Sequence, residues 1–218
     1  MSGAVASEFR SFTGNDAAAP ACLVWRLGAP MRVASTAPVG GGIGRRAWVL
    51  NIQVPEGYAR RDTGVHEAEV AEALALAGSG VGMLTAADVG RVAVSDEEPG
   101  VRVEVTVGLS LPVWAAAPED ARARELARLP GTINVVAFVP TRHSDAALAN
   151  LLCTVTEAKA QALADGGIQG TGTASDAVTV LCPRSGPVEP FGGPRSTYGA
   201  PLARAVYGAL RAGMEARA

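Results

Sequence analysis

The sequence has few of the residues that usually mark a binding or catalytic class. It contains a single lysine, Lys159, among nineteen lysine and arginine residues, and two histidines. The net charge is −2, and the arginines form no basic stripe, so there is no electrostatic footprint for nucleic acid. The three cysteines are too few and too scattered for a disulfide framework. We therefore expect small, buried, free thiols, a cytoplasmic location and no nucleic-acid partner.

Long apolar runs are missing as well. No window approaches the roughly 20 apolar residues that cross a membrane, so we expect no membrane partner. The opening MSGAVASEFRSFTGND lacks the positive start and apolar stretch of a signal peptide. Residues 1–20 offer little to bury and are expected to form a poorly ordered tail, which leaves residues 21–218 as one domain.

Several familiar catalytic motifs are absent: the G-x-S-x-G elbow, the phosphate-binding G-x-x-x-x-G-K-[ST] loop and the zinc-binding H-E-x-x-H. The run HEAE places His66 and Glu69 one helical turn apart, but two ligands do not make a metal site. A histidine on a helix surface is the plainer interpretation. We expect neither a metal nor an organic cofactor.

The chain does contain short apolar strands that alternate with helical segments. Strands are expected at 22–27, 31–36, 47–54, 81–88, 91–96, 101–107, 133–139 and 176–182, and helices at 64–78, 144–165 and 200–216. The order strand–helix–strand occurs twice, which fits two related lobes in one domain or a coincidental repetition of a common unit. The sequence thus predicts an α/β fold with one mixed sheet or two packed sheets.

The first helix should bury Val65, Val70 and Leu74 and stop at Gly78. The long helix has Ser144 as its N-cap and a glycine pair as its stop. Its apolar seam comprises Leu148, Leu151, Val155, Ala158 and Ala162. Its polar face comprises Asn150, Thr154, Glu157 and Gln161.

Lys159 lies two positions from Glu157 and points to roughly the opposite side of the long helix. With Thr156 it forms a T-x-x-K arrangement similar to the S-x-x-K of serine acyl enzymes. A threonine inside a helix usually bonds the carbonyl four residues back, so this match carries little weight. The bland alternative for the whole polar face is a solvated helix surface.

The run GIQGTGTASDAV joins this helix to the next strand. Successive amides in such a glycine-rich loop can converge on an oxyanion or a carboxamide oxygen. Asp176, at the strand entrance, can hold a base or orient an amine. The alternative is a polar helix–strand connection with no further role.

Eight blocks together indicate a family: STAPVGGGI, VLNIQVP, GVGMLTAADV, TVGLS, GTINVV, ALANLLCTVTEAKAQAL, TGTASDAV and YGAPLARAVYGA. In order and spacing they resemble the adenosylcobinamide amidohydrolases of corrinoid salvage, from about Arg32 to Leu210. The resemblance implies an amidohydrolase domain over 21–218 and a small-molecule corrinoid as partner. It implies hydrolysis of the amide between the corrin propionyl side chain and aminopropanol, giving adenosylcobyric acid for cobalamin salvage. Oligomeric state is left open.

The resemblance also implies site residues, carried over block by block. The catalytic candidates are Glu157, Lys159 and Asp176. The substrate-binding candidates are Ser35, Gly41, Gly42, Asn51, Thr85, Asn134 and Thr173. The lone lysine falls in the EAK block, and an amine can act as a base after losing its proton, which a guanidinium cannot.

The sequence departs from the family pattern after TVGLS, where Leu111 and Pro112 replace a usual Asn-Ala pair. Ala174 replaces a usual glycine in the TGT loop, which restricts the backbone there to ordinary φ values. Two alternatives to the hydrolase follow: a corrinoid-binding protein without catalysis, and an amidase with a different substrate.

Overall fold

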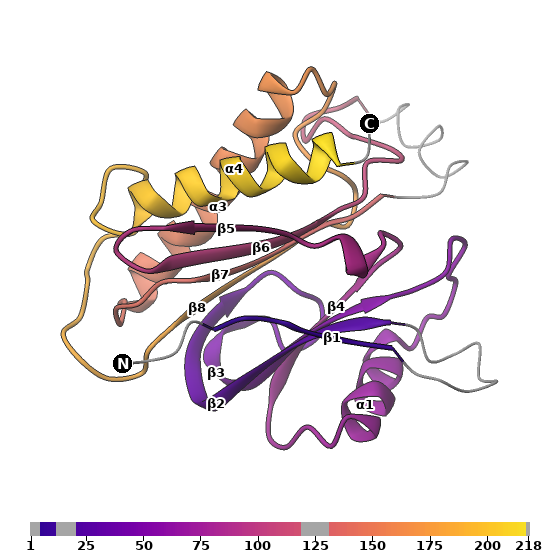
Figure 1. The fold of residues 1–218 in the computed structure, drawn as a ribbon, viewed down its shortest axis with the longest axis horizontal. Helices are drawn as coiled ribbons and strands as arrows, with labels where there is room; N and C mark the ends of the chain where they lie inside the picture. The colour runs from indigo at the N-terminus through magenta and orange to yellow at the C-terminus, as the bar shows by residue number, and fades with distance from the viewer. Residues whose placement is uncertain (1–4, 12–20, 119–130, 217–218) are drawn as a thin grey trace.

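The computed structural model describes residues 5–11, 21–118 and 131–216. Within these residues the chain forms one eight-stranded mixed sheet and three α-helices, which confirms the α/β class (Figure 1). The strands are β1 (Glu8–Arg10), β2 (Cys22–Ser35), β3 (Gly42–Gln53), β4 (Gly80–Thr85), β5 (Ala93–Glu97), β6 (Val101–Val107), β7 (Ile133–Phe138) and β8 (Ala177–Cys182). The helices are α1 (Thr63–Ala73), α3 (Asp145–Asp165), α4 (Gly199–Glu215) and the 3-10 turn η1 (Val89–Arg91).

The sheet has the strand order β4-β3-β2-β8-β7-β6-β5, with β1 paired to β2. The pairs β3–β4 and β7–β8 are parallel, and all other pairs are antiparallel. Each parallel pair is joined by one helix, α1 or α3, because parallel neighbours need a crossover. The two strand–helix–strand units that the sequence predicts are therefore present, each closed as a parallel pair.

Strand β2 connects the two halves of the sheet. It pairs with β3 along its length, and its last four residues, Arg32–Ser35, also pair with β8. In Figure 1 the sheet folds into two layers, with α3 and α4 outside β5–β8 and α1 outside the β1–β4 half. We call these halves the α3 lobe and the α1 lobe.

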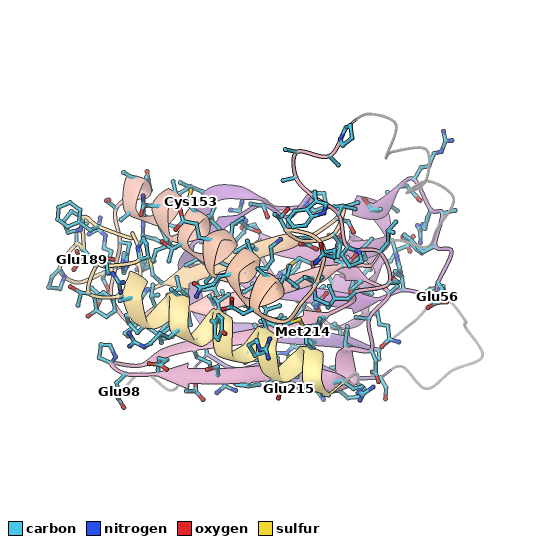
Figure 2. The ribbon with its side chains drawn as sticks, turned by 90° about the horizontal axis from the view of Figure 1, so that it is seen from above. Glu56, Glu98, Cys153, Glu189, Met214 and Glu215 are labelled. Carbon is cyan, nitrogen blue, oxygen red and sulfur yellow. The ribbon has the colours of Figure 1, made fainter. Side chains whose placement is uncertain are left out.

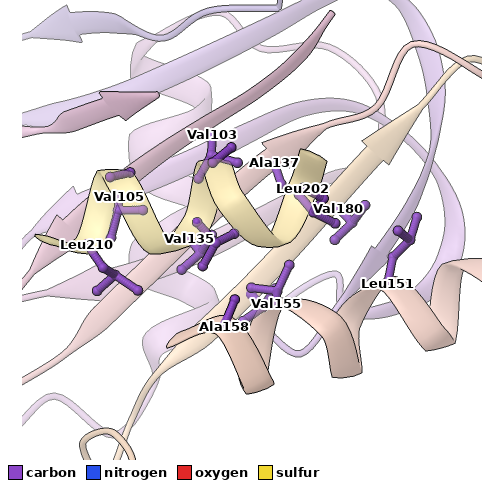
Figure 3. Packing of buried hydrophobic residues seen from close by; sticks show 14 of the residues in the cluster. Val103, Val105, Val135, Ala137, Leu151, Val155, Ala158, Val180, Leu202 and Leu210 are labelled. Carbon is purple, nitrogen blue, oxygen red and sulfur yellow. The ribbon is translucent and has the colours of Figure 1, made fainter. Parts of the chain in front are cut away.

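Three apolar clusters hold the layers together. The largest lies between β6–β8 and the helices α3 and α4 (Figure 3). A second joins the two lobes through alternate residues of β2, β3, β4, β7 and β8, and a third seats α1 on β2 and β3. All six residues of β7 and of β8 are buried, which explains why these strands read as continuous apolar runs.

The long helix agrees with its prediction. The Ser144 hydroxyl accepts from the Ala147 amide at 3.1 Å, and Gly167 takes a left-handed φ of 74° after the last turn. All five residues of the expected seam are buried. Thr154, expected on the polar face, is instead 1% exposed and donates to the Gly192 carbonyl at 2.8 Å.

The first helix differs from its prediction. It ends at Ala73, before Gly78, and Ala75 takes the left-handed conformation at φ 50°. Val65 is 54% exposed, and the buried face instead includes His66 and Glu67. The expectation of a surface histidine was wrong, because α1 turns a polar pair toward the sheet.

Three local features of the strands also differ. The two strands expected at 22–36 are one strand with an irregularity between Arg26 and Met31. Strand β3 begins at Gly42, inside the expected glycine loop. Glu8–Arg10, within the expected tail, pairs with β2.

Two further observations concern exposure. Cys22 and Cys182 are buried thiols, but Cys153 is exposed on the outer side of α3, contrary to expectation (Figure 2). Among the described residues, no helix combines the length and the apolar character that crossing a membrane requires.

Candidate functional site

A cavity of about 310 Å³ lies where the two lobes meet at one end of the sheet. Its volume is near the lower limit for a small-molecule site, roughly 300 Å³. From the α1 lobe it is lined by Pro38, residues 54–58 and residues 83–87. From the α3 lobe it is lined by Gly108, Ser110, Gly131, Thr132, Asn134, Ser175 and Ala177. The lining includes Thr85 and Asn134, two of the predicted substrate-binding residues.

The carboxamides of Asn51 and Asn134 join the two lobes behind this cavity. Asn134 Nδ2 donates to Asn51 Oδ1 at 2.8 Å and to the Leu84 carbonyl at 3.0 Å. Asn51 Nδ2 donates onward to Thr106 Oγ1 at 2.9 Å. A carbonyl can only accept, so Leu84 fixes which Asn134 atom is the nitrogen. Asn51 thus crosslinks the lobes, while Asn134 contributes to the cavity wall.

Two hydroxyl groups in the cavity wall contact each other. Thr132 Oγ1 and Ser175 Oγ are 2.7 Å apart, and Ser175 also lies within 3.3 Å of the Gly131 carbonyl. A hydroxyl carries one donor and two acceptor sites, so this pair retains capacity to bind a polar ligand. Both residues lie within family-like blocks, but neither is among the predicted site residues, and their pairing across 43 positions is not visible in the sequence.

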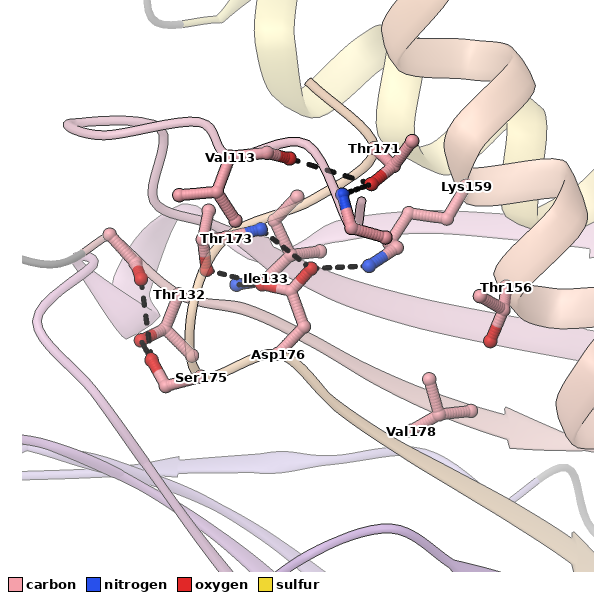
Figure 4. A network of polar contacts seen from close by, with 12 residues as sticks. Val113, Thr132, Ile133, Thr156, Lys159, Thr171, Thr173, Ser175, Asp176 and Val178 are labelled. Carbon is pink, nitrogen blue, oxygen red and sulfur yellow. Dashed lines mark hydrogen bonds and ion pairs between the residues drawn. The ribbon is translucent and has the colours of Figure 1, made fainter. Parts of the chain in front are cut away.

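Asp176, the neighbour of Ser175, is the centre of a buried network (Figure 4). Its Oδ1 accepts from the Ile133 amide at 2.9 Å and from Thr173 Oγ1. Its Oδ2 accepts from the Thr173 amide at 3.0 Å and forms an ion pair with Lys159 Nζ. The side chains of Lys159 and Asp176 are each 9% exposed. The carboxylate therefore ties α3, the start of β7 and the loop before β8 together.

Figure 4 shows Lys159 on one side of Asp176 and the Thr132–Ser175 pair on the other. The structure thus brings three predicted residues together, Lys159, Thr173 and Asp176, behind the cavity wall. Because Ile133 follows Thr132 and Asp176 follows Ser175, the network fixes the backbone that carries both hydroxyls. Its geometry is that of a support for the wall.

The glycines of the loop before β8 are required by close contacts. A Cβ at Gly172 would lie 2.4 Å from both Lys159 Nζ and Asp176 Oδ2. A Cβ at Gly170 would lie 3.0 Å from Pro112 Cβ, and Val113 bridges to Gly172. The segment that departs from the family pattern therefore packs directly on this loop.

The predicted residues Ser35, Gly41 and Gly42, at the end of β2 and the start of β3, do not line the cavity. Ser35 Oγ contacts Thr179 Oγ1 at 2.8 Å and accepts from the Ala37 amide at 3.1 Å. A Cβ at Gly41 would lie 2.2 Å from the Ala37 carbonyl oxygen, and Gly42 has φ 80°. These residues fold the backbone beside Pro38, which lines the cavity.

The structure does not bring Glu157 to this site. Glu157 lies on the exposed face of α3, away from buried Lys159. Thr156 Oγ1 donates to the Leu152 carbonyl at 3.0 Å, four residues back. The T-x-x-K match therefore reflects ordinary helix bonding of the threonine.

On the α1 side, a polar group that the sequence did not identify adjoins the cavity. Tyr58 lines the cavity, and its hydroxyl is 2.7 Å from His66 Nδ1. The neighbouring Glu67 is 1% exposed, and neither carboxylate oxygen has a hydrogen-bond partner among the described residues. Burial raises the pKa of Glu67 to about 7. Glu69 is bound by Arg60 at 2.8 and 2.9 Å.

A second hollow, of about 680 Å³, lies at the start of α3 beside residues 189–197. Glu56 of the first cavity and Glu189 of this hollow lie at opposite ends of the molecule (Figure 2). The second hollow is lined by exposed side chains such as Phe191, which is 68% exposed. The cavity between the lobes, with its buried polar wall, is the better candidate site.

Comparison with known proteins agrees with the resemblance in the sequence. Two curated proteins, both named adenosylcobinamide amidohydrolase, are similar to this chain. The one from Halobacterium salinarum is 40% identical over 122 residues, 54% of this chain and 51% of that protein, so the match spans about half of its length. The one from Methanosarcina mazei is 28% identical over 188 residues, 82% of this chain and 88% of that protein. Residues 7–218 match the family described as adenosylcobinamide amidohydrolase, and the chain belongs to that family.

Proposed function

We propose that this protein hydrolyses the amide between the corrin propionyl side chain and aminopropanol in adenosylcobinamide. The products are adenosylcobyric acid and 1-aminopropan-2-ol, and the reaction is a cytoplasmic step of cobalamin salvage. The observation that carries the proposal is the cavity between the lobes. It gathers residues from six separate family-like blocks into one wall: Pro38, Val54 with Pro55, residues 83–87, Gly108 with Ser110, Gly131 with Thr132 and Asn134, and Ser175 with Ala177.

The size of the cavity limits what it holds. Sites that enclose a whole drug-sized ligand measure roughly 300–1,000 Å³, and this one, at about 310 Å³, is at the lower end. A corrin is larger than a typical drug-sized ligand. We therefore place the amide-bearing branch inside the cavity and the corrin at its mouth.

The residues around the cavity divide into two roles. Thr132, Ser175 and Asn134 form the polar wall, and their hydroxyl and carboxamide groups hold the substrate amide. Such groups lower the barrier when they bind the oxygen on which charge develops. Lys159 and Asp176 keep the two hydroxyls in position from behind. Glu157, on the outer face of α3, is assigned no step.

The test is to incubate the purified protein with adenosylcobinamide and to measure released aminopropanol, with and without divalent metal. The proposal expects release together with loss of the starting corrinoid. An intact corrinoid that nevertheless binds, seen as a spectral or calorimetric titration, would show a binding protein without hydrolase activity. Neither binding nor release would indicate an amidase for another substrate.

One observation supports the non-catalytic alternative. Leu111 and Pro112 stand where the family commonly has Asn-Ala, and the segment packs on the loop that carries Ser175. A carboxamide lost at this place removes one polar contact from the edge of the cavity. Restoring Asn-Ala at 111–112 and repeating the aminopropanol assay separates a weakened hydrolase from a binding protein.

A further inference from the structure

The cavity needs a group that moves protons, and the described residues of the α3 lobe offer none that is free along the cavity wall. Amide hydrolysis takes a proton from the attacking water and delivers one to the leaving nitrogen. Lys159 and Asp176 are bound to each other, and the carboxylate also accepts three further hydrogen bonds. Two side chains along the described cavity wall can ionise, Glu56 and Tyr58. Both belong to the α1 lobe.

Of these two, Tyr58 is connected to a base. Its hydroxyl is 2.7 Å from His66 Nδ1, and the two rings are tilted by 30° with centroids 5.5 Å apart. His66 is 5% exposed, so it reaches solvent poorly and communicates with the cavity through Tyr58. Imidazole is the side chain whose charge most readily changes near neutral pH.

The remaining nitrogen of this histidine supports the same interpretation. His66 Nε2 is buried and has no hydrogen-bond partner among the described residues, whereas Nδ1 contacts the tyrosine. A buried polar atom without a partner costs stability and calls for an explanation. His143 Nε2 shares this feature, so the contact of His66 Nδ1 with Tyr58 is what distinguishes His66. The charged groups around His66 are Asp62, Glu67 and Glu69, with Arg60 bound to Asp62 and Glu69.

We propose that Tyr58 and His66 form the proton relay of the amide cleavage, with Tyr58 as the catalytic residue and His66 as its proton reservoir. This inference rests on the proposed function. Water adds its oxygen to the amide carbon and gives a proton to the Tyr58 oxygen, which passes its own proton to His66 Nδ1. The C–N bond then breaks with its electron pair on nitrogen, Tyr58 protonates that nitrogen, and His66 returns the proton to Tyr58. One water is consumed, and a carboxylic acid and an amine result.

The test compares Tyr58→Phe and His66→Gln with Tyr198→Phe as a matched control. Tyr198 also lies against a histidine, His143, with ring centroids 5.5 Å apart, and its hydroxyl accepts from Thr141. It belongs to a different part of the molecule, next to the second hollow. We expect kcat to fall on the order of 10²–10⁴-fold in both relay variants, with little change in KM, and to stay normal in the control.

A second readout requires no turnover. The sequence has two histidines, so the imidazole NMR signals of His66 and His143 are readily assigned. Tyr58→Phe should shift the imidazole signals of His66, because it removes the hydroxyl at Nδ1, and leave those of His143 in place, which also shows that the variant is folded. Normal kcat in Tyr58→Phe, or a change in KM alone, overturns the relay while the hydrolase stands. A wild-type protein that releases no aminopropanol overturns both proposals.

Discussion

Each lobe contains two parallel strands joined by a helix, and each of these helices buries a lysine or glutamate side chain. The two lobes differ in whether that side chain has a partner. In the α3 lobe, the helix between the parallel strands buries Lys159, and a carboxylate from the same lobe meets it. In the α1 lobe, the corresponding helix buries Glu67, which has no hydrogen-bond partner among the described residues. Burying a charge costs several kcal/mol unless a partner and hydrogen bonds offset it.

This difference in pairing indicates that the two lobes contribute differently to the cavity. The paired lysine is part of a saturated network, so the α3 lobe supplies a fixed wall that carries Thr132 and Ser175. The unpaired glutamate stands beside His66, and its pKa is raised by burial. The α1 lobe thus retains a carboxyl group that exchanges its proton near neutral pH. On our proposals, the α3 lobe holds the substrate amide and the α1 lobe moves the proton.

The largest expected effect comes from Asp176→Asn, which removes the negative charge that pairs with Lys159. Asp176→Asn leaves a buried ammonium group without its counter-charge and weakens three hydrogen bonds. Breaking a buried ion pair from one side typically costs about 3–5 kcal/mol. Urea unfolding should show a loss of this size, together with reduced aminopropanol release. A variant as stable as the wild type would mean that the pair contributes little to the wall.

A smaller effect should come from Glu67→Gln, and it should depend on pH. The pKa of about 7 in the folded protein lies above the ordinary value of 4.5, so the folded protein binds more protons between these values. Stability therefore falls as pH rises from about 4.5 through 7, by roughly 3 kcal/mol in total.

The Glu67→Gln variant lacks this loss, because its side chain does not ionise. It should match the wild type at pH 4.5 to within the cost of the substitution and gain relative to it at pH 8. Urea unfolding of both proteins at the two pH values gives the difference. Parallel pH dependence in the two proteins would show that Glu67 is paired or hydrated in the folded state.

The smallest of these effects is expected from Lys159→Arg. Nζ packs so closely on Gly172 that even a Cβ there would lie 2.4 Å away, and a guanidinium is larger than an ammonium. Overpacking of this kind costs about 1–3 kcal/mol, and turnover should fall as the wall shifts.

The control for Lys159→Arg is the reverse exchange at an exposed ion pair. The side chain of Arg204 is 59% exposed and bonds Glu97, so Arg204→Lys should change stability by less than about 0.5 kcal/mol. Melting temperatures and aminopropanol release are compared for both variants. If both behave like the wild type, the single lysine is an accident of composition.

The sequence predicted those features that depend on local spacing. The Ser144 cap, the apolar seam of α3 and its glycine stop follow from neighbours within a few turns, and all three are confirmed. Contacts between residues far apart in the sequence could not be predicted from local spacing. Thr132 meets Ser175 only because β7 and β8 are parallel neighbours, and His66 is buried only because α1 packs with a polar pair inward.

Two particular cases show what local spacing can and cannot predict. The periodicity of 64–78 suggested Val65 as a core residue, but the sheet contacts a face that begins at His66. Glu157 and Lys159 share one short block, and the helix places them on exposed and buried faces, as their spacing predicts. The catalytic role of Glu157 stays a prediction.

The central claim is that the amide is cleaved in the cavity between the lobes, and Thr132→Val tests it most directly. Valine keeps the shape and removes one hydroxyl from the wall, while Thr156→Val makes the same change on the exposed face of α3. The account predicts that aminopropanol release falls on the order of 10²-fold or more in Thr132→Val and is unchanged in Thr156→Val. Equal rates for Thr132→Val and the wild type, at equal stability, would contradict it.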